Sequence, residues 1–262
     1  MNVNTAAALE LEPQPLPRTA RIITVASGKG GVGKTHIATN LALAWARAGQ
    51  RVLLVDGDLG LANVNVLLGI SPDRNASHLL DGKSDFSDVV TRYRDYFDIL
   101  PAGSALTRLA ELDVGGQVRL LDVLMAHGHA YDIIIVDAGA GIGSNVRLAL
   151  SIADDVLVVM NPEATSLTDA YALVKVASLS QVRAPFGVVV NRVRQAEEAR
   201  EMHGCLDSAA RSFLGKHVEF FGYVYQDQSV ERAMRNQDPF VRSAPDSPAA
   251  RCVQALAKRL AA

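Results

Sequence analysis

Short apolar runs alternate with helical patterns along most of the chain. The runs are uniformly hydrophobic, which is typical of strands in a parallel sheet that helices cover on both faces. Helical patterns occupy most of the intervals, beginning with residues 37–48 after the first run. This order predicts an α/β fold, a single-domain doubly wound, mostly parallel β-sheet flanked by helices. The predicted strands are 21–26, 51–56, 97–101, 131–137, 156–160, 186–191 and 218–224.

Other segments are less regular. Residues 1–19, rich in Ala, Glu and Pro, are predicted to form a flexible N-terminal leader before a domain that spans 20–262. After a helical pattern at 61–68, we expect two short helices, near 77–80 and 86–93, and then a helical region that runs to about residue 126.

The last helical pattern, 249–260, is basic but holds no aromatic anchor. A basic amphipathic helix can attach to a membrane, but Ala and Leu side chains bury little area there. We therefore expect this helix to pack on the domain, so that any membrane contact is weak or indirect.

Composition and charge exclude several function classes. The chain has 262 residues, of which 49% are hydrophobic and 21% are charged, the mix of an ordinary globular domain. A formal net charge of -2 gives no general attraction to nucleic acid or an anionic membrane. No apolar run approaches the roughly 18 residues of a membrane span. Acidic residues also separate the arginines between 192 and 211, so we expect no nucleic-acid partner.

The clearest chemistry lies in the segment Gly28-Lys29-Gly30-Gly31-Val32-Gly33-Lys34-Thr35. It stands between a predicted strand and a predicted helix, the context that a phosphate-binding loop requires. Glycines let backbone N–H groups turn toward phosphate oxygens, and the helix N-terminus adds a positive dipole. Lys34 is predicted to reach the terminal phosphates, and Thr35 to offer its hydroxyl to Mg²⁺. We add His36, the next residue, to the predicted nucleotide-binding set.

Polar side chains end three of the predicted strands. Asp56, Asp137 and Asn191 each follow an apolar run, and ligands of doubly wound sheets bind at the carboxyl ends of strands. Asp137 has the usual position of a carboxylate that holds Mg²⁺ through water. Asp56 and Asp58 point to the same side if the chain is extended there, so one could hold the ion while the other orients an attacking water. The predicted metal ligands are Thr35, Asp56 and Asp137.

A second lysine at the start of the loop carries a family resemblance. Residues 29–35 resemble the deviant Walker ATPases of the MinD/ParA family. The resemblance implies ATP and Mg²⁺ as cofactors, a homodimer when ATP is bound, and slow, partner-stimulated hydrolysis to ADP and phosphate. Lys29 would reach the phosphates of the partner subunit, whereas spacing alone would make it an exposed basic residue. Residues 55–63 resemble the first switch, in which Asp58 would orient the water. The catalytic residues implied are Lys29, Lys34 and Asp58.

The resemblance extends over most of the chain. Residues 137–142 resemble the second switch, and 161–163 resemble a segment near the dimer interface. Residues 191–192 correspond to the segment that reads adenine, and 225–230 to the loop that closes over the base. The nucleotide-binding residues implied in total are Gly28, Lys29, Gly30, Gly31, Val32, Gly33, Lys34, Thr35, His36, Glu163, Asn191, Arg192, Tyr225 and Asp227.

Residues 162–172 are most similar to the flagellar-number regulators FlhG and FleN. This similarity implies control of the number or placement of flagella, in the cytoplasm or at the inner face of the cell membrane or the cell pole. The implied partners are the flagellar GTPase FlhF, flagellar switch components or a transcriptional regulator. Two alternatives stay open: a MinD- or ParA-type positioning ATPase for a division site, DNA or other cargo, and a weakly catalytic ATP-binding regulator of a transcription factor.

Three residues depart from the family pattern. Gly57 replaces an alanine between the switch aspartates, Ala138 stands where a threonine is common, and Tyr225 replaces a proline. None of these changes removes an essential charge. We therefore expect nucleotide binding to survive, while the rate of hydrolysis is left open.

Overall fold

The computed structural model describes residues 20–57, 63–80, 83–101 and 122–261. The predicted leader at 1–19, the switch residue Asp58 and most of the helical region before residue 126 lie outside these ranges. The end of that region, 122–127, is helical and continues into a short 3₁₀ turn, η2 (Gly128–Ala130).

One sheet organises the described part of the chain. Its eight strands lie in the order β3-β4-β2-β5-β1-β6-β7-β8. Each neighbouring pair is parallel except β3 and β4, so the predicted doubly wound, mostly parallel sheet is confirmed. The strands are β1 (Arg21–Ser27), β2 (Val52–Gly57), β3 (Thr91–Tyr93), β4 (Phe97–Leu100), β5 (Ile133–Ala140), β6 (Asp155–Met160), β7 (Phe186–Val193) and β8 (Val218–Tyr225).

The predicted helix at 86–93 is wrong in its second half. The helix α4 (Phe86–Val89) ends early, and Thr91–Tyr93 form strand β3, antiparallel to β4. Tyr93 is paired with Phe97 in this hairpin, and their rings lie 5.2 Å apart. Pairing with β4 and burial of Tyr93 therefore override the local helical pattern.

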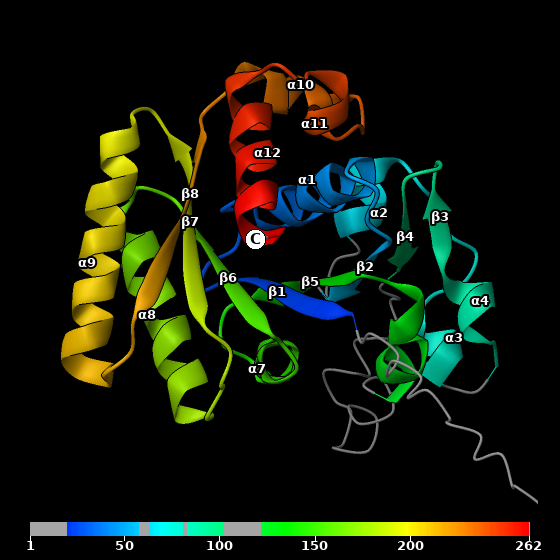
Figure 1. Cartoon of the computed structure of the whole chain (residues 1–262), viewed down its shortest axis with the longest axis horizontal. Coiled ribbons are helices and arrows are strands. Elements are labelled where there is room, and N and C mark those ends of the chain that lie inside the picture. Colours follow the sequence, from blue (N-terminus) through cyan, green and yellow to red (C-terminus); the bar gives the residue numbers. More distant parts are fainter. Residues whose placement is uncertain (1–19, 58–62, 81–82, 102–121, 262) are drawn as a thin grey trace, which may run out of the picture.

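Helices cover both faces of the sheet, which explains the uniformly apolar strands. Figure 1 shows α1 and α12 on one side of the sheet and α7 on the other. Successive strand residues accordingly belong to two separate cores, with Ile134 in one and Ile135 in the other. Packed on one face are α3 (Ala76–Leu80), α4, α7 (Ser144–Ser151), α8 (Ala164–Leu179) and α9 (Ala196–Leu214). Packed on the other are α1 (Lys34–Arg47), α2 (Asn63–Leu68), α10 (Gln228–Arg235), α11 (Phe240–Ser243) and α12 (Pro248–Ala261).

The C-terminal helix α12 packs on the domain, as expected. It buries a continuous apolar side that includes Val253, Leu256 and Leu260 against the core next to α1. The indole Nε1 of Trp45 donates a hydrogen bond to the carbonyl of Ala257 over 2.9 Å, which joins α12 to α1. Among the described residues, no helix has both the length and the apolar character needed to cross a membrane.

Candidate functional site

The predicted phosphate loop joins β1 to α1, at the carboxyl edge of the sheet. Gly31 and Gly33 have φ angles of 78° and 92°, which residues with a side chain rarely adopt. Gly33 is also the N-cap of α1, and its carbonyl accepts a hydrogen bond from the N–H of Ile37. A Cβ on Gly28 would lie 2.0 Å from the carbonyl oxygen of Asp169, so the start of the loop packs directly on α8. The loop therefore requires glycine for its conformation and for its close packing.

Lys34 points into the molecule. Its Nζ lies 3.2 Å from Oδ1 of Asp137, and the two side chains are 7% and 0% exposed. Asp56 occupies the position paired with Asp137 on the neighbouring strand β2, and its Oδ2 accepts a hydrogen bond from the N–H of Val64. Two buried carboxylates and the amine of the loop thus meet at the same edge of the sheet.

These groups fit a magnesium ion bound together with phosphates. Thr35 lies in the first turn of α1, directly after Lys34, and the carboxylates of Asp56 and Asp137 are on the adjacent strands. Within the described ranges, no group of three or more His, Cys, Asp or Glu side chains could hold a metal ion. Mg²⁺ needs no such group, because it is usually bound through one or two carboxylates and the substrate phosphates. Asp58, the predicted water-orienting residue, lies outside the described residues.

Lys29 has an environment opposite to that of Lys34. Its side chain is 42% exposed, and its Nζ lies 3.3 Å from Oε2 of Glu163. The same amine donates a hydrogen bond to Oγ1 of Thr165 over 3.2 Å. Glu163 is the N-cap of α8, so the fold brings these predicted site residues together across 134 positions of sequence. The loop therefore carries one buried lysine and one lysine on the outer surface.

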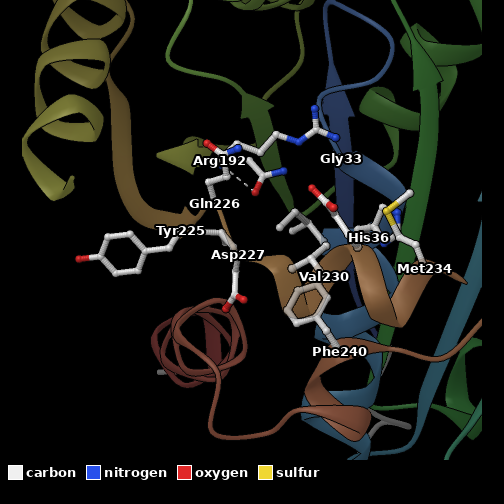
Figure 2. A pocket seen from close by; sticks show the side chains of 13 residues that line it. Gly33, His36, Arg192, Tyr225, Gln226, Asp227, Val230, Met234 and Phe240 are labelled. Carbon is white, nitrogen blue, oxygen red and sulfur yellow. Dashed lines mark hydrogen bonds between the residues drawn. The ribbon is translucent and has the colours of Figure 1, made fainter. Parts of the chain in front are cut away.

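A cavity of about 250 Å³ opens beside the loop, and it gathers most of the residues assigned to the base. Figure 2 shows Gly33, His36, Arg192 and Tyr225 around it. The amide Nδ2 of Asn191 donates to the carbonyl of Val32 over 2.7 Å, and its Oδ1 accepts from the N–H of Arg192. These two bonds fix the orientation of the Asn191 amide at the wall of the cavity.

His36 lines this cavity as a neutral side chain. Burial, with a smaller contribution from the charge of Arg192, lowers the pKa of the imidazole to about 4. The ring therefore carries no charge near neutral pH, and the cavity gains no cation from it.

Several lining residues were missed by the sequence analysis. Gln226 and Val230 lie within the segment 225–230 that the resemblance assigned to the base, although they were not named as binding residues, and Glu231 directly follows that segment. Met234 and Phe240 come from α10 and α11 and supply apolar wall. They carry no local motif, because only the packing of α11 against α1, and of α10 against α11, brings them to the cavity.

The arginines between β7 and β8 are largely matched by acids. Arg200 forms an ion pair with Glu197, and Arg211 forms one with Asp207. The surface of α9 therefore presents mixed charge, which does not favour binding to a nucleic-acid backbone.

Comparisons with known proteins find relatives that match most of this chain. An AAA domain family matches residues 20–184. The antiactivator FleN of Pseudomonas aeruginosa is 35% identical over 92% of this chain and 86% of its own length. The flagellum site-determining protein YlxH of Helicobacter pylori is 29% identical over 86% of this chain and 76% of its own.

A solved structure is similar over the whole domain. The septum site-determining protein MinD of Pyrococcus horikoshii, in complex with Mg-ADP, superposes with a TM-score of 0.78 and is 26% identical. The superposition covers 92% of this chain and 96% of that one. From its sequence, its sheet and its phosphate loop, this chain belongs to the MinD/ParA family of P-loop ATPases, where it is similar to the FleN and FlhG flagellar regulators.

Proposed function

We propose that this protein is a Mg²⁺-ATP-dependent dimerising ATPase switch that controls the number or placement of flagella. The observation that carries the proposal is the different burial of the two lysines in one loop. Lys34 is buried against Asp137, whereas Lys29 is on the surface. Together with the similarity to FleN and YlxH, this arrangement supports a nucleotide site that is completed by a second subunit.

In this proposal the loop binds the triphosphate. Its backbone N–H groups cradle the phosphates, and Lys34 exchanges Asp137 for the terminal phosphate oxygens. Thr35, Asp56 and Asp137 hold the magnesium ion, which when bound neutralises charge on the phosphates. Asp58 orients the attacking water, because positioning is the main task in phosphoryl transfer.

The base and sugar would occupy the cavity beside the loop. The fixed amide of Asn191 can read the polar edge of adenine, since an asparagine amide matches an adjacent donor and acceptor. Val230, Met234 and Phe240 supply apolar contact for the ring, and the carboxylate of Glu231 is available to accept from ribose hydroxyls. The cavity thus combines apolar contact for a ring with polar groups that can orient it, as a nucleotide-binding cavity requires.

Dimerisation would follow from the position of Lys29. When a second subunit approaches with ATP bound, the amine leaves Glu163 and Thr165 for the phosphates of the partner. The exposed ion pair that it leaves contributes little stability, so this exchange has a small cost. ATP then favours the dimer because its terminal phosphate is held from both subunits, and hydrolysis returns the protein to monomers.

The switch would act through a partner-binding surface that the protein exposes in only one nucleotide state. FleN is an antiactivator and YlxH determines flagellum sites, so the proposed partners are a transcriptional regulator, the GTPase FlhF or flagellar switch components.

Deleting the gene from its own genome tests the assignment. Flagella are counted and mapped by electron microscopy, before and after restoring the wild type or Lys34→Ala. We expect a changed number or position that only the wild type restores; unchanged flagella would overturn the assignment.

A second candidate is a positioning ATPase for division sites. The similarity to a septum site-determining MinD favours it, because that protein shares the fold over nearly the whole chain. The same deletion strain distinguishes the two, since misplaced septa with normal flagella would support this candidate instead.

A further inference from the structure

Asp227 lines the cavity but its carboxylate faces away from it. The residue lies between β8 and α10, within residues 225–230 at the base side of the site, which we call the base-side loop. Figure 2 shows its carboxylate turned away from Arg192 and His36, toward the C-terminal helix. Oδ1 accepts a hydrogen bond from the N–H of Ser229 over 2.8 Å, and Oδ2 accepts one from the N–H of Ala249 over 3.1 Å. One side chain therefore bonds to the first turns of two helices.

Each of these bonds satisfies a helix terminus. Asp227 is the N-cap of α10, and Ala249 is the second residue of α12. The first N–H groups of a helix have no partner within the helix, and a carboxylate there also interacts favourably with the helix dipole. Burial opposes ionisation, but the two backbone N–H groups hold the pKa of Asp227 below its usual value. The carboxylate is thus a charged link between α10 and α12.

The same helices are joined to the phosphate side of the site. Trp45 of α1 bonds to Ala257 of α12, and Asn40 of α1 accepts a hydrogen bond from the N–H of Val241 in α11 over 2.9 Å. The N-terminal turn of α1 carries Lys34 and Thr35. A continuous path therefore runs from the phosphate loop along α1 to α12, and from α12 through Asp227 to the base-side loop.

We infer that Asp227 is a positioning residue, which holds the base-side loop at a set distance from the phosphate loop and does not touch the nucleotide. The inference rests on the proposed function, because it deepens the account of how this site binds ATP. It differs from a direct role in which the carboxylate would bind the ribose hydroxyls. The two roles can be distinguished by affinity. Loss of a positioning residue weakens nucleotide binding whether or not the sugar has those hydroxyls, whereas loss of a direct contact weakens binding only when they are present.

Asp227→Ser is the informative variant. Serine is a good N-cap, so α10 keeps its cap. Its single, shorter hydroxyl cannot also reach Ala249, so the link to α12 is lost. Asp246→Ser is the matched control, because Asp246 is an exposed carboxylate just before the same helix. Calorimetry with each full-length protein then compares Mg-ATP, Mg-2′,3′-dideoxyATP and magnesium with inorganic triphosphate.

Asp227→Ser should weaken the binding of both nucleotides by the same factor, about tenfold, which corresponds to the loss of one hydrogen bond to a charged group. Inorganic triphosphate, which has no base, should bind as it does to the wild type, and Asp246→Ser should change nothing. The inference is overturned if the affinity of Asp227→Ser for ATP equals that of the wild type, or if its affinity for triphosphate falls by the same factor. It is also overturned if its affinity for the dideoxy nucleotide is not reduced. A wild-type chain that binds neither ATP nor triphosphate would instead overturn the proposed function, and this inference with it.

Discussion

The amine of Lys34 lies 3.2 Å from Oδ1 of Asp137, and both side chains are almost completely buried. These residues come from α1 and β5, and they meet because β1, which leads into the loop, pairs with β5 and places Val25 beside Asp137. Removing one partner of a buried ion pair lowers the stability of the fold, because the charge of the other partner then lies in a poorly solvated position. In the proposed function, phosphate oxygens replace the carboxylate as the partner of the lysine amine.

Lys34→Ala should abolish ATP binding and also destabilise the empty protein. Asp137 stays buried without the lysine amine, so we expect a loss of about 3 kcal/mol in the free energy of unfolding. Urea unfolding and ATP titration measure the two effects. Lys175→Ala, at an exposed position on α8, is the control and should alter neither. Unaltered ATP affinity in Lys34→Ala would contradict the assignment of the phosphate loop.

Lys29→Ala should bind ATP as the wild type does but fail to dimerise. Its ion pair with Glu163 is on the surface, so stability should change by less than about 1 kcal/mol. Light scattering with saturating Mg-ATP gives the mass of each variant. Dimers of normal stability would show that Lys29 is an ordinary surface lysine.

Asp58→Ala should retain ATP and accumulate as the dimer. The prediction rests on the family resemblance, which assigns Asp58 to the attacking water and not to binding. Turnover of radiolabelled ATP should fall while the dimer persists in light scattering. A variant that stays monomeric with ATP would show that this role is wrong.

Gly33→Ala should weaken ATP binding by displacing Asn191. Gly33 has a φ of 92°, and a Cβ there would lie 2.3 Å from Nδ2 of Asn191. Gly215→Ala is a sharp control, because Gly215 has a φ of 62° but no atom within 4 Å of its added Cβ. Both variants should lose about 1–2 kcal/mol of stability from the backbone conformation. Only Gly33→Ala should also lose ATP affinity, and equal affinity in the two would refute the contact with Asn191.

Stability should fall as the pH drops from about 6.5 to about 4, in part because of His36. Burial lowers its pKa to about 4 in the folded protein, so between these values the unfolded chain binds more protons. Protonation then favours unfolding, by up to about 3 kcal/mol at the acidic end. His36→Gln should flatten this part of the pH profile in urea unfolding. His129→Gln, at an exposed position, should keep the wild-type slope.

The amino-acid sequence predicted the strands well but ended several of them early. Asp56, Asp137 and Asn191 interrupt their apolar runs, which suggested that the strands stop there. The backbone pairing continues past all three, for example from Asp56 and Asp137 to Gly57 and Ala138. Ladder hydrogen bonds depend on the backbone, so a polar side chain at the edge of the core does not end a strand.

By itself, the sequence determined most of the sheet and the phosphate loop, because each depends on local chemistry. Uniform apolar runs need cover on both faces, and glycines at set spacing need a turn that accepts phosphate. Only the tertiary structure decided that Lys29 contacts Glu163, that Asn191 lies against Gly33, and that Asp227 faces Ala249. These contacts join segments that are distant in the sequence, and which side chains meet depends on how the helices and strands pack. No local pattern records that packing.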